Sequence, residues 1–183
     1  MRPLTARRPK PMLPVAGRPL LEHVLAAAVE AGATRLVLVV GYHDEAVREH
    51  FGDTFRGVPV EYAIQETLEG TALAVRAAKP ELHEAPFAVL AGDNLYDGAS
   101  LAELYESAPA LGAFEVDDPR PYGVLELNGD HVTAVTEKPE DPASNLVNAS
   151  AYVFEPAALE WLEQVEQSER GEYELTDVLA QQI

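Results

Sequence analysis

Two short runs of apolar residues constrain the fold of this chain more than any other feature. Residues 35–40 read RLVLVV and residues 87–91 read FAVLA, and neither run alternates between apolar and polar side chains. Runs of this length are too short for a helix, and an apolar character on both faces is typical of buried parallel strands. The two runs therefore predict an α/β fold with a central sheet covered by helices.

Helical patterns separate the predicted strands of the first half. Residues 19–32 carry apolar side chains at helical spacing, and Gly32 stands where a C-terminal cap is expected. Strands that alternate with helices predict parallel pairing through right-handed crossovers. The same half contains the predicted helices 44–51, 71–78 and 99–107 and the predicted strand 58–64.

The pattern changes in the second half. Residues 113–116, 123–127 and 132–136 are predicted strands, and Asn128-Gly129 between the last two is typical of a hairpin turn. Antiparallel strands are therefore added, which predicts a Rossmann-like mixed sheet flanked by helices. Residues 149–154 are one more predicted strand, and the last predicted helices are 155–167 and 174–183.

Length and composition limit the class of protein. The chain has 183 residues, 47% of them hydrophobic, which predicts one globular domain over residues 1–183. The absence of cysteine excludes disulfides, thiolate metal sites and cysteine nucleophiles. There is no apolar run of about 18 residues, and the prolines among the first residues exclude an amphipathic targeting helix. We therefore expect a cytoplasmic protein with no membrane partner.

The charge is strongly acidic. Thirty-one acidic residues against 13 Lys and Arg give a formal net charge of −18 at pH 7. Such a surface repels nucleic acid and anionic membranes, and it is typical of proteins adapted to high salt. Because the lysines are Lys10, Lys79 and Lys138 alone, each is a stronger candidate for a site than a lysine usually is.

The first 19 residues form a proline-rich basic loop. Five cations fall within the first 18 residues, Lys10 among them, and no acid precedes Glu22. In so acidic a chain this cluster is suited to phosphate, although a frayed basic terminus without a ligand is the alternative. A doubly wound sheet usually opens with its central strand. No strand precedes the first predicted helix, so we expect the fold to lack that strand.

Asp93 follows the predicted strand 87–91 directly. Ligands bind at the carboxyl ends of central parallel strands in open α/β sheets. A lone carboxylate at that place suits Mg²⁺, which keeps several waters and contacts phosphate oxygens. Asp93 is thus a candidate metal ligand, and the alternative is that it caps a turn.

A third candidate segment joins the predicted strand 58–64 to the helix 71–78. Gln65 has an amide that can pair with a base edge, Gly70 lets the backbone approach a ring, and Thr71 stands at the helix start. The alternative for Thr71 is a capping role alone.

Glu137 and Lys138 follow the predicted strand 132–136 and precede Pro139. The Glu137 carboxylate can accept hydrogen bonds from two sugar hydroxyls while the Lys138 ammonium contacts a phosphate. The alternative is a surface ion pair at a strand end.

These segments occur in an order that resembles one enzyme family, the sugar-phosphate nucleotidyltransferases, which include glucose-1-phosphate thymidylyltransferase and N-acetylglucosamine-1-phosphate uridylyltransferase. The resemblance runs over nearly the whole chain. The residues that carry it are Arg2-Pro3-Leu4-Thr5, Pro9-Lys10-Pro11-Met12-Leu13-Pro14-Val15 with Gly17, Gln65 with Gly70-Thr71-Ala72, Gly92-Asp93, Tyr122-Gly123-Val124, Glu137-Lys138-Pro139, and Asn148 before Tyr152-Val153-Phe154.

The resemblance implies a reaction and a role for each matched position. A sugar 1-phosphate attacks the α-phosphorus of a nucleoside triphosphate in line, and pyrophosphate leaves without a covalent enzyme intermediate. Mg²⁺ is the implied cofactor. The implied roles are phosphate binding by Lys10, metal binding by Asp93, sugar-phosphate binding by Lys138, nucleotide binding by Gln65, Gly70 and Thr71, and sugar binding by Gly123, Glu137 and Asn148.

The chain also departs from the family pattern. Family members begin with a strand and a glycine-rich loop ending Gly-Thr-Arg, which holds the triphosphate, and they continue beyond the position of Ile183 to a second metal ligand. We therefore expect a partial domain, cut short at both ends, whose 183 residues alone are weakly active or inactive. Sequencing the DNA directly upstream of the Met1 codon would test whether the missing strand and glycine-rich loop are encoded there.

Two other functions remain open at this stage. A non-catalytic homologue that binds nucleotide sugar and regulates a partner is one, although the retention of Lys10, Asp93 and Lys138 argues against it. An enzyme that uses another phosphate acceptor, such as phosphocholine or a sugar alcohol phosphate, is the other. The residues name neither the base nor the sugar, and open sheet edges make a homo-oligomer possible.

Overall fold

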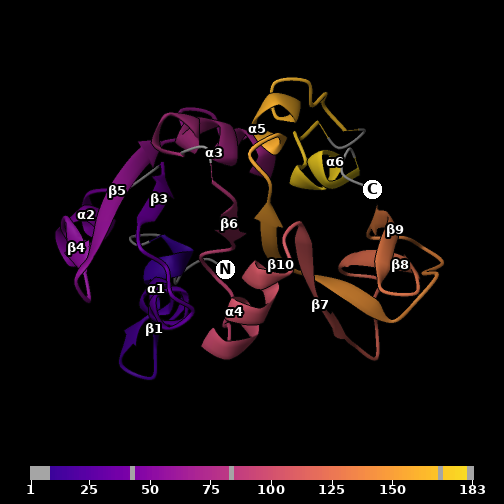
Figure 1. Cartoon of the computed structure of the whole chain (residues 1–183), viewed down its shortest axis with the longest axis horizontal. Coiled ribbons are helices and arrows are strands. Elements are labelled where there is room, and N and C mark those ends of the chain that lie inside the picture. The colour runs from indigo at the N-terminus through magenta and orange to yellow at the C-terminus, as the bar shows by residue number, and fades with distance from the viewer. Residues whose placement is uncertain (1–8, 42–43, 83–84, 169–170, 181–183) are drawn as a thin grey trace.

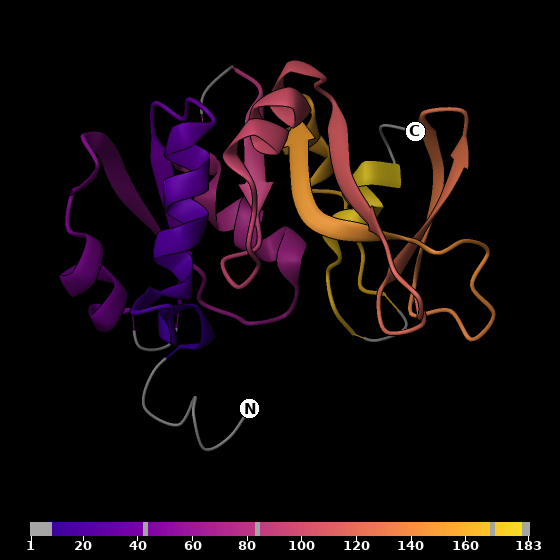
Figure 2. The ribbon, with the colours of Figure 1, turned by 90° about the horizontal axis from the view of Figure 1, so that it is seen from below.

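The first half alternates helix and strand as predicted. The computed structural model describes residues 9–41, 44–82, 85–168 and 171–180. Its first half runs through α1 (Leu20–Glu30), β3 (Leu36–Val40), α2 (Glu45–Phe51), β5 (Val58–Ile64) and α3 (Thr71–Ala78). The predicted pairing is present where β3 lies parallel to β5, with Leu36 opposite Val60. The α/β class is therefore confirmed in this half (Figures 1 and 2).

The second half is dominated by antiparallel strands, as its turn pattern predicted. A helix, α4 (Gly98–Glu106), follows β6 (Phe87–Leu90). The strands β8 (Gly123–Asn128) and β9 (His131–Glu137) form the predicted hairpin. The remaining strands are β7 (Ala110–Glu115) and β10 (Leu146–Phe154), and the last helices are α5 (Ala158–Trp161) and α6 (Leu175–Ala180).

The structure also contains short elements that the sequence pattern did not predict. A 3₁₀ turn, η1, begins at Lys10, and a hairpin of two short strands, each of two residues, leads from it into α1. A further short strand lies antiparallel to the start of β5. These elements are η1 (Lys10–Met12), β1 (Pro14–Val15), β2 (Arg18–Pro19), β4 (Thr54–Phe55) and η2 (Lys79–Glu81).

The mixed sheet is divided between β3 and β6. One ladder has the order β3-β5-β4, and the other has the order β6-β10-β8-β9 with β7 also paired to β10. Within the described residues no backbone ladder joins β3 to β6, which are the inner strands of the two groups in Figure 1. The two groups therefore meet through helices, and residues of α1, α4 and β10 share one buried cluster that includes Ala27, Leu101 and Ala151.

Two sequence expectations are wrong. The strand before Asp93 was expected to be a central parallel strand, but β6 pairs antiparallel with β10, a strand of the second half, and stands at the end of the order β6-β10-β8-β9 within the described residues. The helix expected over 155–167 is limited to Ala158–Trp161, and the chain continues after the buried Leu162 in turns, with Val165 packed against the same buried cluster. The expected helix over 174–183 is present as α6, and residues 181–183 lie outside the described residues.

The strand β10 has an irregular centre that matters for the site. Its register against β7 shifts between Asn148 and Tyr152, which marks a bulge. Within the bulge Ser150 adopts a φ of 54°, a left-handed conformation that is rare for a residue with a side chain. The bulge redirects the side chains of β10 near Asn148, and bulges are frequent next to active sites.

Candidate functional site

Lys10 and Asp93 meet in the folded chain although 83 positions separate them. Their side chains form an ion pair, and 44% of the Lys10 side chain and 32% of the Asp93 side chain remain exposed. The turn before Asp93 is packed tightly: a Cβ placed on Gly92 would lie 3.4 Å from Leu21 and 3.6 Å from Pro11. The N-terminal 3₁₀ turn is therefore held against the end of β6 by close packing, and the ion pair is open to a ligand.

The three residues predicted to bind sugar also converge. Gly123 stands opposite Glu137 in the β8–β9 hairpin. A Cβ on Gly123 would lie 3.0 Å from Oε2 of Glu137 and 3.6 Å from Cβ of Asn148. The missing side chain of Gly123 therefore leaves room for the Glu137 carboxylate beside Asn148.

Lys138 extends this group with a strained backbone. Its φ is 47°, and its N–H donates a 2.9 Å hydrogen bond to the carbonyl of Tyr122. Its Nζ lies 3.4 Å from Oε1 of Glu137. Non-glycine residues in the left-handed region cost about 1 kcal/mol or more and cluster at functional sites. This left-handed conformation of Lys138 ends the strand after Glu137, and the ammonium group stays beside the Glu137 carboxylate.

The side chain of Asn148 is fixed at both ends. Its Oδ1 accepts a 2.7 Å hydrogen bond from the N–H of Ser150, and its Nδ2 donates a 2.8 Å hydrogen bond to the hydroxyl of Tyr152. Burial raises the pKa of Tyr152, so this phenol stays neutral around pH 7. Within the part of the chain that the structure describes, one N–H of the Asn148 amide and one lone pair of its oxygen remain for a ligand.

The residues predicted to bind the nucleotide form a separate group. Nε2 of Gln65 donates a 3.1 Å hydrogen bond to the carbonyl of Gly70, which fixes the amide across the loop. Gly70 has a φ of 130°, and a Cβ there would overlap the backbone of Tyr173. Glycine is therefore required at this position for packing as well as for conformation.

Thr71 has a structural partner. Its Oγ1 accepts a 2.9 Å hydrogen bond from the N–H of Leu175, the first residue of α6. On either side of it, the N–H of Tyr173 donates to Glu69 and the N–H of Ala72 donates to Tyr173. Thr71 thus satisfies the start of a helix, as the capping alternative stated, but the helix is α6 rather than its own α3. Its predicted role in nucleotide binding stays a prediction.

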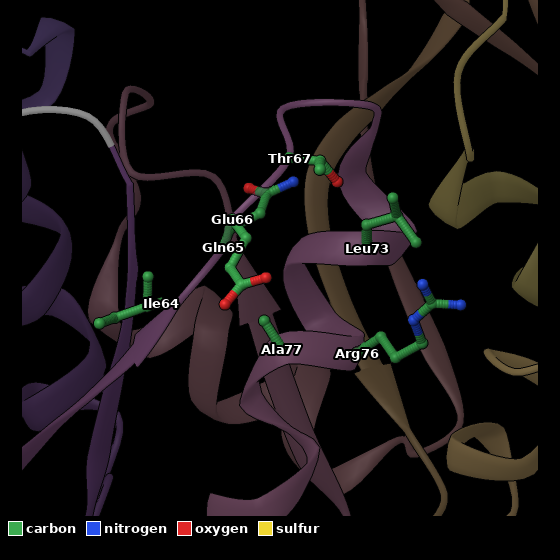
Figure 3. A pocket seen from close by; sticks show the side chains of 7 residues that line it. All are labelled: Ile64, Gln65, Glu66, Thr67, Leu73, Arg76 and Ala77. Atoms are coloured by element: carbon green, nitrogen blue, oxygen red, sulfur yellow. The ribbon is translucent and has the colours of Figure 1, made fainter.

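A cavity of about 260 Å³ lies beside this group (Figure 3). Its walls come from the end of β5, the loop that follows and α3. Gln65 is therefore at the border of a concave surface. The lining residues are Ile64, Gln65, Glu66, Thr67, Leu73, Arg76 and Ala77.

Sequence reasoning missed three residues that hold the backbone of the site in place. Asn94 and Tyr96 bond to the bulge of β10, and Tyr173 contacts the loop of Gly70. None of them stands in a periodic pattern or in a charged motif. Asn94 directly follows Asp93, which is the one signal in the sequence that was available for it.

Two features of the described residues bear on cofactor and membrane. No group of three or more His, Cys, Asp or Glu side chains in them is arranged to hold a metal ion. No helix within the described ranges is long and apolar enough to cross a bilayer.

The chain belongs to the nucleotidyl transferase family, whose sequence profile matches residues 1–183. This confirms the resemblance to sugar-phosphate nucleotidyltransferases. Among its relatives is UTP–glucose-1-phosphate uridylyltransferase AglF of Haloferax volcanii, which is 37% identical over 98% of this chain and 76% of that protein. The bifunctional protein GlmU of Methanococcus maripaludis is 38% identical over 100% of this chain. The chain spans 44% of the length of that relative.

Solved structures confirm the fold class. A UDP-glucose pyrophosphorylase crystallised with UDP-glucose superimposes with a TM-score of 0.89, at 23% identity over 100% of this chain and 81% of that one. A structure described as a putative glucose-1-phosphate thymidylyltransferase from Bacillus anthracis gives a TM-score of 0.84 at 24% identity, over 97% of this chain and 75% of that one. At these identities the likeness establishes the fold alone.

Proposed function

We propose that the protein transfers a nucleotidyl group from a nucleoside triphosphate to a sugar 1-phosphate and releases pyrophosphate. The observation that carries this proposal is the convergence of Gly123, Glu137 and Asn148, in a member of the nucleotidyl transferase family. A carboxylate and a fixed amide side by side are suited to the hydroxyls of a sugar ring. The ammonium of Lys138 stands beside them, where a phosphate on the sugar is expected.

The chemistry that these residues supply is positioning and charge neutralisation. Two anions must approach each other for in-line attack at the α-phosphorus, and the developing charge must be stabilised. Lys138 would hold the sugar phosphate, and Lys10 would bind the triphosphate. Both ammonium groups are partly exposed, so they are accessible to these ligands.

The end of β6 fits Mg²⁺ in one respect. Mg²⁺ is commonly held by one or two carboxylates together with substrate phosphates and water, so the single carboxylate of Asp93 is sufficient on the protein side. A bound Mg²⁺ would neutralise charge on the phosphate oxygens. The Asp93 side chain stays 32% exposed beside Lys10, so it is accessible to this cation.

UTP and glucose 1-phosphate are the substrates to test first, because they are named for AglF, which is 37% identical. We also propose that the acidic surface adapts the protein to high salt. The assay measures pyrophosphate release at high KCl with Mg²⁺ and UTP, dTTP, CTP or GTP. The acceptor panel holds glucose 1-phosphate, N-acetylglucosamine 1-phosphate, phosphocholine and a sugar alcohol phosphate.

We expect turnover with one sugar 1-phosphate, at a rate below that of AglF. Lys138→Met should lower the rate roughly 100-fold, whereas Lys79→Met, whose lysine pairs with Glu163, should have no effect. Binding of a nucleotide sugar without turnover would support the non-catalytic alternative. A chain that neither turns over nor binds a nucleotide sugar by calorimetry would contradict the proposal.

A further inference from the structure

Two parts of the candidate site lie on different strands and are joined by one tyrosine. Asp93 is on the turn after β6, and Asn148 is at the bulge of β10. Tyr96 lies between them in the fold although the sequence places it three residues after Asp93. The proposed function does not use Tyr96 itself.

The hydroxyl of Tyr96 satisfies backbone groups of both segments. It accepts a 3.1 Å hydrogen bond from the N–H of Ala91 on the β6 side. It lies 2.8 Å from the carbonyl oxygen of Ser150 on the β10 side, to which it donates. Nδ2 of Asn94 adds a 3.0 Å hydrogen bond to the neighbouring carbonyl of Ala149. These bonds add to the direct 3.0 Å hydrogen bond from the N–H of Ala91 to the carbonyl of Ser150, so the turn that carries Asp93 is tied to the bulge at the carbonyls of Ala149 and Ser150.

The bulge passes this constraint to Asn148. Ser150 is the residue with the left-handed φ of 54°, and its N–H is the group that donates to Oδ1 of Asn148. A residue in this region of φ persists when its surroundings hold it there. The hydroxyl of Tyr96, bonded to the carbonyl of the same residue, is one of those surroundings.

We propose that Tyr96 is a positioning residue, whose hydroxyl holds the turn of Asp93 and the bulge of Asn148 at one fixed spacing. This inference rests on the proposed function, in which the two residues contact the metal and the sugar of one substrate complex. Tyr96 itself contacts backbone rather than substrate. Its loss is expected to misplace Asn148 relative to Asp93.

The surroundings of the phenol suit this role. The ring packs against the buried cluster of Ala27, Leu101 and Ala151, so its direction is fixed. Burial raises the pKa of Tyr96 to about 12, and the hydroxyl therefore remains a neutral donor throughout the neutral range.

The test compares Tyr96→Phe with Tyr105→Phe in the same chain. Both variants keep the ring and lose one hydroxyl. Tyr105 lies on α4, which follows Tyr96, and its hydroxyl donates a 2.9 Å hydrogen bond to the carbonyl of Pro86, away from the bulge. It therefore controls for the removal of a phenolic hydroxyl that donates to a backbone carbonyl elsewhere in the fold.

The first readout is independent of activity. The side-chain amide signals of Asn148 in a ¹⁵N NMR spectrum, assigned with Asn148→Asp, should shift in Tyr96→Phe and stay in place in Tyr105→Phe. The second readout is kinetic: the KM for sugar 1-phosphate should rise about tenfold in Tyr96→Phe, while the KM for the triphosphate changes less than about twofold. A merely structural role would move both KM values together.

The outcomes separate this inference from the proposed function. Unchanged Asn148 signals in a folded Tyr96→Phe variant would overturn the positioning role, whether or not the chain is active. Absence of turnover and of nucleotide-sugar binding in the wild-type chain would count against the proposed function, while a shift of the Asn148 signals would still establish the positioning by Tyr96.

Discussion

At the scale of single residues, Gly123 decides where the Glu137 carboxylate can lie. The two residues face each other across the β8–β9 hairpin, and a Cβ on Gly123 would come within 3.0 Å of the carboxylate. A separation this short is below ordinary van der Waals contact, so one group must move. The glutamate side chain is the flexible partner.

Gly123→Ala should therefore displace the Glu137 carboxylate. We expect the KM for sugar 1-phosphate to rise about tenfold with little change in the KM for the triphosphate, measured by initial rates of pyrophosphate release. Gly129→Asn is the control, because Gly129 lies in the same hairpin, has nothing within 4 Å of its added Cβ and has a φ of 64°, which asparagine adopts more readily than alanine. Equal effects of the two substitutions on the sugar KM would count against this account of Gly123.

The residues that sequence reasoning found are those with chemistry and a position in a motif. Lys10 and Asp93 were named for their charges and their places in the chain, and they pair in the structure. Tyr96 was missed because a tyrosine in a loop has no periodicity, and its hydroxyl acts on backbone atoms more than 50 positions away. Contacts between a side chain and a remote backbone leave no local pattern.

At the scale of elements, the loop of Gly70 depends on the C-terminal segment. Two backbone hydrogen bonds join it to Tyr173, and Thr71 accepts from the first N–H of α6. The side chains of Leu175 and Val178 are buried against Ala72 and Val75 of α3. The predicted nucleotide loop around Gly70 is therefore held in place by Tyr173 and Leu175, which lie about 100 positions later in the chain.

Thr71→Val should expose this dependence. The substitution keeps the shape and leaves the N–H of Leu175 without its acceptor, which should lower the free energy of unfolding by about 1–3 kcal/mol in urea titrations. Thr71→Ser keeps the acceptor and should retain most of the stability. Equal losses in the two variants would contradict this account, because Thr71→Val alone removes the acceptor of the Leu175 N–H.

Strand positions were predictable, whereas the pairing of β6 was not. The apolar runs at 35–40 and 87–91 are both strands, because burial on two faces requires apolar side chains at every position. The partner of β6 is β10, which begins more than 50 residues later in the sequence, and no residue near β6 signals this pairing.

At the scale of the whole molecule, charge dominates the expected response to salt. A formal charge of −18 repels itself at low ionic strength, and the screening length falls from about 10 Å at 0.1 M salt to about 3 Å at 1 M. We expect the Tm to rise by at least about 5 °C between 0.1 and 1 M KCl, measured by circular dichroism.

The shape of that curve identifies the cause. Screening predicts the steepest rise below about 0.5 M and equal effects of KCl and K₂SO₄ at the same ionic strength. Exclusion of salt from the surface predicts a steady rise that is larger for sulfate. A Tm that falls on addition of KCl would contradict adaptation to high salt.

The division of the sheet between β3 and β6 also has a consequence for cooperativity. Each strand group has its own buried cluster, one around Leu38 and Phe51 and the other around Phe154 and Leu162. Because helices rather than a backbone ladder connect the groups, the two groups are expected to melt in separate steps. In scanning calorimetry the measured enthalpy should then exceed the van't Hoff enthalpy, and equal values would mean that the packing of the helices is sufficient to make both groups unfold as one unit.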